Sequence, residues 1–98
     1  MLTETADALL MRRQDIRNIT QRHGATKVSL FGSFARGTAS ESSDVDILVD
    51  LQPGRTLLDL VAIKQDLEDL LGRPVHVVTM AALSPYLRED VLGKAIAL

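Results

Sequence analysis

Hydrophobic residues recur at helical spacing in the first part of the chain. From about residue 5 to residue 23 they would line one side of an amphipathic helix. The acidic residues of this segment come early and its arginines late, an order that suits the helix dipole. Gly24 follows, and glycine commonly ends a helix. The residues expected on the apolar side are Leu9, Ile16, Ile19 and His23, and the histidine is expected to be a packed residue rather than a ligand.

Two more helices are predicted in the second half of the chain. Apolar residues at helical spacing extend from about Thr56 to Leu71, and Gly72 supplies the stop. A shorter helix is expected from Pro85 to about Lys94, because proline is favoured in a first helical turn.

Three short stretches of alternating or continuous apolar residues predict β-strands. They run from Lys27 to Phe31, from Asp44 to Leu51 and from Pro74 to Thr79. The small and polar segment Ser33–Ser43 could return the chain tightly between the first two strands. The order of elements favours an α+β fold, in which a small mixed β-sheet is flanked by helices.

Composition limits the class of protein. The 98 residues fit one domain spanning residues 1–98, with little room for a second one. The formal net charge of -2 disfavours a long nucleic acid as substrate, because such proteins usually carry a basic surplus. The absence of cysteine, of a basic and apolar leader and of a long apolar segment leads us to expect a cytoplasmic protein without a membrane span.

Asp44 and Asp46 are the first candidates for chemistry. Two residues apart on a strand, their side chains would project from the same face. Adjacent carboxylates repel each other unless a cation lies between them, and Mg²⁺ prefers oxygen ligands. The pair could therefore bind the metal of a phosphoryl or nucleotidyl transfer. A chance tripeptide on a solvated strand would look the same, and Asp50 is expected to be a solvated strand end.

Gly32 and Ser33 are the second candidates. They follow a predicted strand and precede a segment, residues 33–37, that could form a short helical turn. Glycine permits close approach of the backbone to an anion, and the serine hydroxyl could bond a phosphate. An ordinary turn with Ser33 as helix cap is the alternative. Arg36 could hold phosphate or orient an aspartate, or simply pair locally on the surface.

The two candidate groups occur together at a characteristic spacing. Ten residues separate Ser33 from Asp44, which gives the pattern G-S-x₁₀-D-x-D. This pattern resembles the signature of the DNA polymerase beta-like nucleotidyltransferases. The adjoining A-R-G and S-D-V-D-I-L-V sequences, the following helix and the L-S-P-Y-L segment resemble its minimal nucleotidyltransferase (MNT) branch.

The resemblance implies a role for each of these residues. Gly32 and Ser33 would hold the phosphates of ATP, and Asp44 and Asp46 would bind Mg²⁺. Family members typically carry a third carboxylate on a later strand, where this chain has His76. A neutral imidazole could act as a general base or as a metal ligand, or the histidine could fill the position without chemistry. Reduced or altered catalysis is therefore expected rather than full loss.

The resemblance also implies a partner. MNT proteins are commonly paired with a HEPN toxin, expected here to be the product of the adjacent gene, and can transfer AMP from ATP to a tyrosine hydroxyl of that toxin. Such an antitoxin is the leading hypothesis. The alternatives are a protein that neutralises its partner by binding alone and a nucleotidyltransferase for a small molecule of antibiotic type.

Several remaining residues carry expectations of their own. Lys64 and Arg73 are expected to be surface charges, while Tyr86 and Leu87 could cap the core or form an interface. An apolar tail suggests a homo-oligomer or hetero-oligomer, because such a tail could be buried against another chain. The residues of this tail are Val91, Leu92, Ala95, Ile96 and Leu98.

Overall fold

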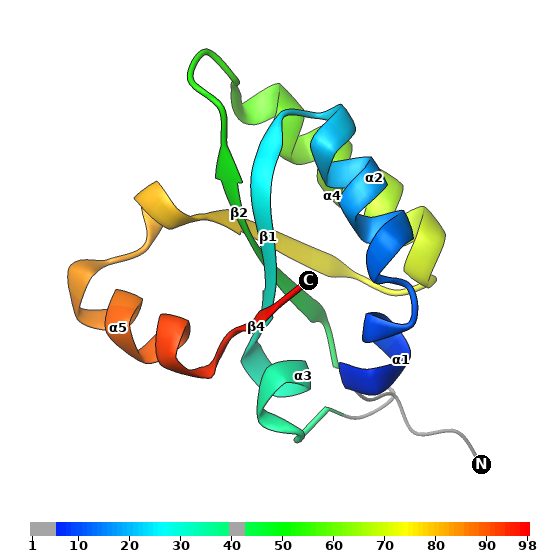
Figure 1. Ribbon diagram of the computed structural model, residues 1–98, viewed down its shortest axis with the longest axis vertical. Coiled ribbons are helices and arrows are strands. Elements are labelled where there is room, and N and C mark those ends of the chain that lie inside the picture. Colours follow the sequence, from blue (N-terminus) through cyan, green and yellow to red (C-terminus); the bar gives the residue numbers. More distant parts are fainter. Residues whose placement is uncertain (1–5, 40–42) are drawn as a thin grey trace.

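A computed structural model describes residues 6–39 and 43–98 of the chain. Its centre is a four-stranded sheet with the strand order β3-β2-β1-β4 (Figure 1). The expected α+β fold is confirmed, and the sheet is mixed. Three strands agree with the predicted ones to within two residues, whereas β4 was not predicted. The strands are β1 (Ala25–Phe31), β2 (Val45–Leu51), β3 (Val75–Thr79) and β4 (Ile96–Ala97).

The helices differ from the prediction mainly at the N-terminal end. The single helix predicted for residues 5–23 is wrong, because the chain turns at Met11 and Arg12. There the Arg12 amide bonds the carbonyl of Leu9 at 3.0 Å, and its guanidinium reaches the carbonyl of Leu70 at 2.6 Å. The helices are α1 (Ala6–Leu10), α2 (Arg13–Arg22), α3 (Gly32–Arg36), α4 (Leu57–Leu71) and α5 (Pro85–Lys94), with a 3₁₀ turn, η1, at Met80–Ala82.

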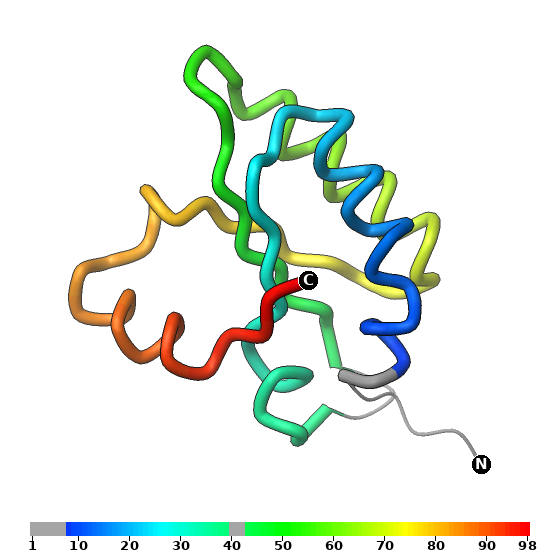
Figure 2. Tube along the Cα trace, in the orientation of Figure 1, coloured from blue at the N-terminus to red at the C-terminus, as the bar shows by residue number. Residues whose placement is uncertain are grey.

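The length of each connection agrees with the relative direction of the two strands that it joins. The short segment containing α3 joins β1 to β2, which are antiparallel. The long helix α4 joins β2 to β3, which are parallel and therefore need a crossover. β4 returns at the end of the chain and pairs antiparallel with the free edge of β1. The tube in Figure 2 shows α3 at the end of the sheet where β1 ends and β2 begins.

The core lies between one face of the sheet and helices α2 and α4 (Figure 1). Alternation along β1 and β2 sends Val28, Leu30 and Ile47 into this core. Helix α4 contributes Ile63 and Leu67, both fully buried. Among the described residues, Phe34 is the aromatic side chain of the core, which agrees with the low aromatic content of the sequence.

Helix α4 has well-defined ends. The Thr56 hydroxyl accepts from the amide of Leu58 at 3.2 Å, and the Asp59 carboxylate accepts from the amide of Thr56 at 2.9 Å. Such reciprocal bonds satisfy amides that have no partner within the helix. Gly72 ends the helix with a φ of 69°, a conformation that glycine adopts at little cost. Both ends agree with the prediction from the sequence.

Helix α2 is tied to α4 by a polar contact that the sequence did not indicate. His23 was expected among apolar residues, but its Nε2 atom lies 2.8 Å from the Asp66 carboxylate of α4. The side chain is only partly exposed. The histidine thus packs at the helix pair through a hydrogen bond rather than through apolar contact.

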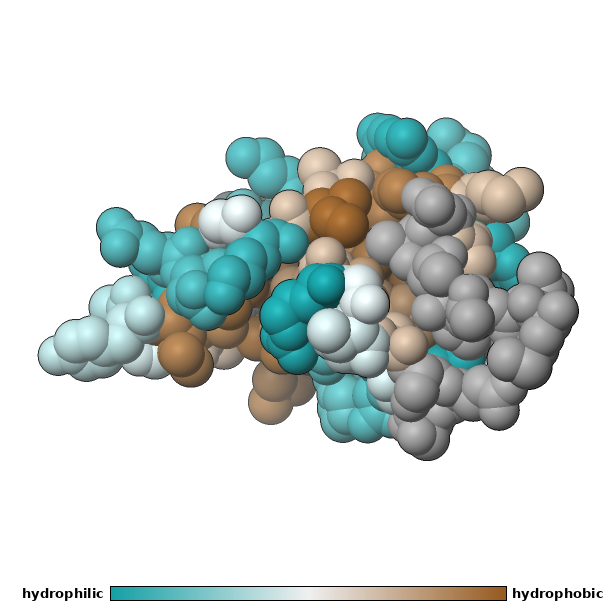
Figure 3. Space-filling view, turned by 90° about the horizontal axis from the view of Figure 1, so that it is seen from below, coloured by the Kyte–Doolittle hydropathy of each residue, from teal (hydrophilic) through white to brown (hydrophobic). Residues whose placement is uncertain are grey.

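The opposite side of the sheet is covered only in part, by α5 and η1 (Figure 1). Tyr86 is 93% exposed and Leu87 is 56% exposed, so they do not cap the core, and their alternative role in an interface stays a prediction. Both residues lie in the first turn of α5, which begins at Pro85. Figure 3, seen from below, shows hydrophobic atoms between hydrophilic ones on the side where α5 lies.

Two residues of the apolar tail pack within their own chain. Ile96 pairs with Leu30 across the strands, and Leu98 is only 6% exposed in the core cluster. Leu92 is 47% exposed, and the expected oligomer stays a prediction. Among the described residues, no helix is long and apolar enough to cross a membrane.

Candidate active site at the junction of β1, α3 and β2

The end of β1 and the start of β2 come together at Gly32. Phe31 is paired with Asp46 across the two strands, and Gly32 follows with a φ of 73°. A β-carbon placed on Gly32 would collide with the Asp46 carboxylate. Only glycine fits here, because any side chain would meet both an unfavourable backbone conformation and this carboxylate. The backbone turn and the carboxylate predicted from the sequence are thus in direct contact.

Asp44, Asp46 and His76 form a second contact. Strands β2 and β3 are parallel in a register that pairs Asp46 with His76. Asp44 lies just before β2 begins, and its Oδ2 atom is 2.7 Å from the Nε2 atom of His76. Both side chains remain accessible, 58% exposed for the histidine and 42% for Asp44. The three predicted site residues therefore share one end of the sheet.

The electrostatics of Asp46 reflect this crowding. Burial is the main cause that raises the pKa of Asp46, and the neighbouring Asp44 carboxylate raises it further. His76 and Arg36 act in the opposite direction and lower it, but do not reverse the shift. The carboxylate is therefore ionised at a cost, which a bound cation would offset.

Ser33 and Arg36 both belong to the short helix α3. The Ser33 carbonyl accepts from the amide of Thr38 at 2.9 Å, and Gly37 closes the helix in the left-handed region with a φ of 76°. Arg36 is exposed and acts on Asp46 only through its charge. The expected short helical turn is confirmed. Arg36 is close enough for its positive charge to lower the pKa of Asp46.

Arg73 is a residue that the sequence did not single out for the site. Its Nη1 atom donates to the carbonyl of Ser43 at 2.8 Å, and its guanidinium lies 5.2 Å from the centre of the Phe34 ring. It was expected to be a surface charge, but it is half-buried between α3 and the segment that leads into Asp44. Cation–π and hydrogen-bond contacts of this kind hold two segments at a fixed distance. No local pattern reveals them, because the contacting residues are far apart in sequence.

The donor set fits magnesium better than a metal that prefers nitrogen or sulfur. Asp44 and Asp46 supply carboxylate oxygens, the ligands that Mg²⁺ usually takes in pairs together with substrate phosphates and water. Among the side chains that the structure describes, no group of three or more acidic, histidine or cysteine residues could enclose an ion. A metal at this site would therefore need oxygens from a phosphate ligand as well.

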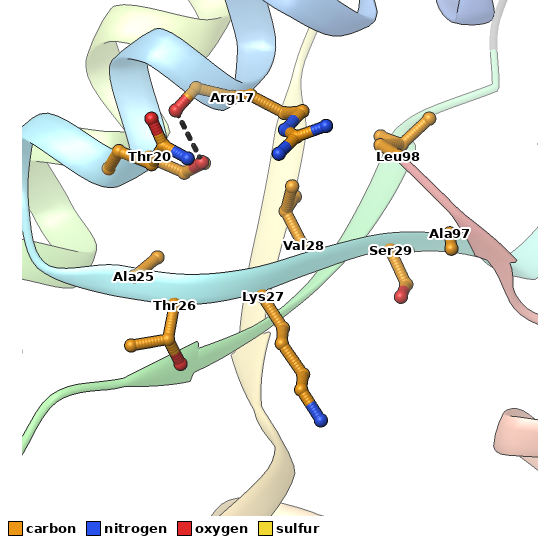
Figure 4. Close-up of a pocket in the computed structure, with 10 residues that line it drawn as sticks. Arg17, Thr20, Ala25, Thr26, Lys27, Val28, Ser29, Ala97 and Leu98 are labelled. Atoms are coloured by element: carbon orange, nitrogen blue, oxygen red, sulfur yellow. Dashed lines mark hydrogen bonds between the residues drawn. The ribbon is translucent and has the colours of Figure 1, made fainter.

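Another cavity lies elsewhere. It has a volume of about 290 Å³ and lies between α2, β1 and the end of the chain. In Figure 4, Arg17 points across it toward Val28, while Lys27 and Ser29 point to the other side of β1. This cavity is thus at the edge of the core face, away from Asp46 on the opposite face.

Comparison with known proteins decides the family. The family model described as a nucleotidyltransferase domain matches residues 13–98 of the chain. The chain belongs to the nucleotidyltransferase domain family. The matched range includes the glycine turn, both aspartates and His76. The match also agrees with the α+β fold described above.

Relatives of the nucleotidyltransferase cover nearly its whole length. It is 42% identical over 84 residues to a Methanocaldococcus jannaschii protein named "putative protein adenylyltransferase", covering 86% of the chain and 90% of that protein. It is 35% identical over 95 residues to the protein adenylyltransferase MntA of Thermococcus cleftensis, covering 97% and 93%. A solved structure titled "putative minimal nucleotidyltransferase" has 47% identity and a TM-score of 0.87, and 97% of each chain is covered.

More distant solved structures share the fold of the nucleotidyltransferase. One is a toxin–antitoxin complex with AMP-PNP, at 23% identity and a TM-score of 0.74, covering 86% of this chain and 69% of the other. Another is a tri-AMPylated HEPN toxin of Shewanella oneidensis with its MNT antitoxin, at 19% identity and a TM-score of 0.68, covering 90% and 69%. At these identities the likeness concerns the fold alone.

Proposed function

We propose that this nucleotidyltransferase is a protein adenylyltransferase that acts as an antitoxin, transferring AMP from ATP to a hydroxyl group of a HEPN-type toxin. The observation that carries the proposal is the contact between the Gly32 turn and the Asp46 carboxylate, beside Asp44. It occurs in a chain whose relatives of similar length are named protein adenylyltransferases. A tyrosine is the expected acceptor on the toxin.

The binding roles follow from the chemistry of the side chains. The backbone at Gly32 and Ser33 would hold the phosphates of ATP, with Arg36 adding positive charge. Asp44 and Asp46 would hold Mg²⁺, which supplies charge neutralisation for the departing pyrophosphate. Positioning and electrostatics account for most of the acceleration in such transfers.

The proton of the acceptor requires a base, and His76 is suited to that task. In the reaction the acceptor oxygen forms a bond to the α-phosphorus, the bond to the β-phosphate oxygen breaks, and the acceptor proton must leave. A neutral imidazole at His76 would take this proton. The Asp44 carboxylate, 2.7 Å from Nε2, would then stabilise the imidazolium. This arrangement replaces the third carboxylate of the family pattern by an aspartate–histidine pair.

A second function deserves a test because of the same hydrogen bond. In the observed geometry one oxygen of Asp44 is occupied by His76. If this bond persists with nucleotide present, metal binding is weakened and the protein would neutralise its partner by contact alone. The two functions differ in whether the toxin gains covalent mass.

The deciding experiment measures the intact mass of the toxin encoded by the adjacent gene after incubation with this protein, ATP and Mg²⁺. A mass gain of one or more AMP units is expected. The matched control is the double variant Asp44→Asn, Asp46→Asn, which removes both carboxylates without changing side-chain size. A stable complex without any mass gain would instead establish neutralisation by binding.

A further inference from the structure

The face of the sheet that carries Asp46 continues as an ordered series of side chains. The pairing of β1 with β2 places Ser29 opposite Leu48 and Lys27 opposite Asp50. Because alternate residues of a strand share a face, these positions follow Asp46 along the same side of the sheet. Figure 4 shows Lys27 and Ser29 pointing away from the core side, opposite to Val28.

A cavity of about 140 Å³ lies over this series of side chains. Its walls come from the sheet, from the 3₁₀ turn η1 and from α5, the helix on the side of the sheet opposite to α2 and α4. The surface of the cavity is more apolar than polar, with charged groups at the end farther from Asp46. Its lining residues are Lys27, Ser29, Leu48, Val49, Asp50, Met80 and Leu92.

The cavity is at a suitable distance from the candidate metal site. Leu48 is two residues beyond Asp46 on β2, and two residues of a strand span about 6.8 Å. A nucleotide whose phosphates lie at Gly32 and Asp46 must place its sugar and base within such a range. Along the sheet face the base would therefore reach Leu48, and its far edge would point toward Asp50, which lies about 13.6 Å from Asp46 along β2.

We propose that this cavity holds the adenine base of the nucleotide; the inference rests on the proposed function. Leu48, Met80 and Leu92 offer an apolar surface for the flat ring. A cavity of about 150 Å³ is enough for one benzene ring, so a base would fill this one and extend toward solvent. The exposed Leu92 is explained by this role, since it is 47% exposed in the free protein.

The charged end of the cavity suits adenine in particular. Lys27 can only donate hydrogen bonds, and an ionised Asp50 can only accept them. One edge of adenine presents an acceptor nitrogen beside a donor amino group, whereas the same edge of guanine presents two acceptors. The pair would therefore accept adenine and oppose the guanine carbonyl. This assigns the choice of nucleotide to residues outside the G-S and D-x-D motifs.

The larger cavity near Arg17 does not fit this role. It lies against α2 and shares Lys27 and Ser29 with the proposed base site, but neither Leu48 nor Asp50 lines it. Arg17 is an exposed, positively charged residue that lines it. The variant Arg17→Ala is therefore a matched control, because it removes a cationic side chain from a cavity without touching the proposed base site.

The test compares two ligands by calorimetry with Mg²⁺ present: AMP-PNP, which has a base, and tripolyphosphate, which has none. Asp50→Ala and Leu92→Asp change exposed side chains, so the fold is expected to persist. Each variant is expected to weaken AMP-PNP binding about tenfold and to leave tripolyphosphate binding within about twofold. Asp50→Ala should also reduce the preference for AMP-PNP over GMP-PNP, and Arg17→Ala should behave like the unchanged protein.

The outcomes separate this inference from the function on which it rests. Unchanged AMP-PNP affinity in both variants, or an equal loss of affinity for tripolyphosphate, would overturn the assignment of the base site and leave the adenylyltransferase proposal standing. If the unchanged protein bound neither ligand, the proposed function would fail, and the base site with it.

Discussion

Gly32 and Asp46 constrain each other at the level of single atoms. The glycine adopts a φ of 73°, and its missing side chain leaves the space that the Asp46 carboxylate fills. A residue with a side chain at position 32 would be strained in this backbone conformation and would also displace the Asp46 carboxylate. The pair therefore links the shape of the backbone turn to the position of the candidate metal ligand.

The substitution Gly32→Ala should damage both stability and activity. The left-handed conformation costs a residue with a β-carbon roughly 1–2 kcal/mol, and the new methyl group would displace the Asp46 carboxylate. Urea denaturation would measure the first effect, and toxin modification the second. Gly54→Ala is a suitable control, since its φ of 88° is also positive but nothing lies within 4 Å of the added carbon. Equal activity of the two variants would contradict the role given to Gly32.

The ionised Asp46 carboxylate should lower the free energy of unfolding at neutral pH. Its pKa is raised above the usual 3.8, mainly by burial, so the folded protein binds the proton more tightly than the unfolded chain. Stability is therefore lost as pH rises from below 3.8 through the raised pKa. Asp46→Asn should melt at a higher temperature than the unchanged protein at pH 7 without metal, and the difference should vanish below about pH 3.8.

Thermal melts over this pH range, with a chelator present, would test the prediction for Asp46→Asn. Saturating Mg²⁺ and nucleotide should narrow the difference, because ligands that bind only the folded state stabilise it. A lower melting temperature for Asp46→Asn at pH 7 would show that the carboxylate stabilises the fold instead.

His76→Ala should separate catalysis from binding. If His76 takes the acceptor proton, the variant should lose about a hundredfold in kcat, with the KM for ATP little changed. Steady-state kinetics with the toxin as acceptor would measure both constants. Because His76 is exposed, its removal should hardly affect folding. His76→Asp, which restores the carboxylate of the family pattern, should recover activity, and an inactive His76→Asp would argue against this assignment.

At the scale of elements, α4 is the crossover that makes β3 parallel to β2. It brings His76 beside Asp46, although the two residues belong to strands separated by a whole helix. The helix begins at a cap formed by Thr56 and Asp59, and it ends at Gly72. Because β3 follows the C-terminal end of α4, the position of His76 depends on where the helix ends at Gly72.

The capping threonine offers a test at this scale. Thr56→Ala removes an N-cap hydroxyl and should lower the free energy of unfolding by about 1 kcal/mol. Chemical denaturation would measure it, with Thr26→Ala as control, since that exposed hydroxyl bonds only a strand carbonyl at 3.2 Å. The cap lies at the far end of α4 from β3, so toxin modification should be nearly unchanged in folded protein. A loss of stability no greater than that of Thr26→Ala would show that the cap does not control the helix.

At the scale of the whole molecule, one sheet serves two purposes. Its core side packs against α2 and α4, which leaves the other side available for ligands (Figure 1). The last strand, β4, covers part of the free edge of β1 and carries Leu98 back into the core. This segment therefore contributes to both the sheet and the core.

Leu98→Ala should therefore be costly although the residue is terminal. Removing a leucine that is 6% exposed typically costs 2–5 kcal/mol. Thermal unfolding of Leu98→Ala would show the loss, and Leu92→Ala is the control, because its side chain is largely outside the core. Similar melting temperatures for the two variants would mean that the β4 tail does not contribute to the core.

The amino-acid sequence by itself determined those features that depend on neighbouring residues. Alternation of apolar residues marked β1, β2 and β3, apolar residues at helical spacing marked α4, and Gly72 marked its end. The spacing of Gly32, Ser33, Asp44 and Asp46 indicated the family. These signals are local because the periods of strands and helices and the conformations of glycine are properties of short segments.

Tertiary structure alone decided which distant residues meet. It broke the N-terminal helix where Arg12 reaches Leu70, and it paired His23 with Asp66. It likewise formed β4 from two residues that have no strand pattern, brought Arg73 onto Phe34 and placed His76 against Asp44. Such contacts depend on the pairing of strands and the packing of helices, and their energies come from partners far apart in the chain, so no local pattern encodes them.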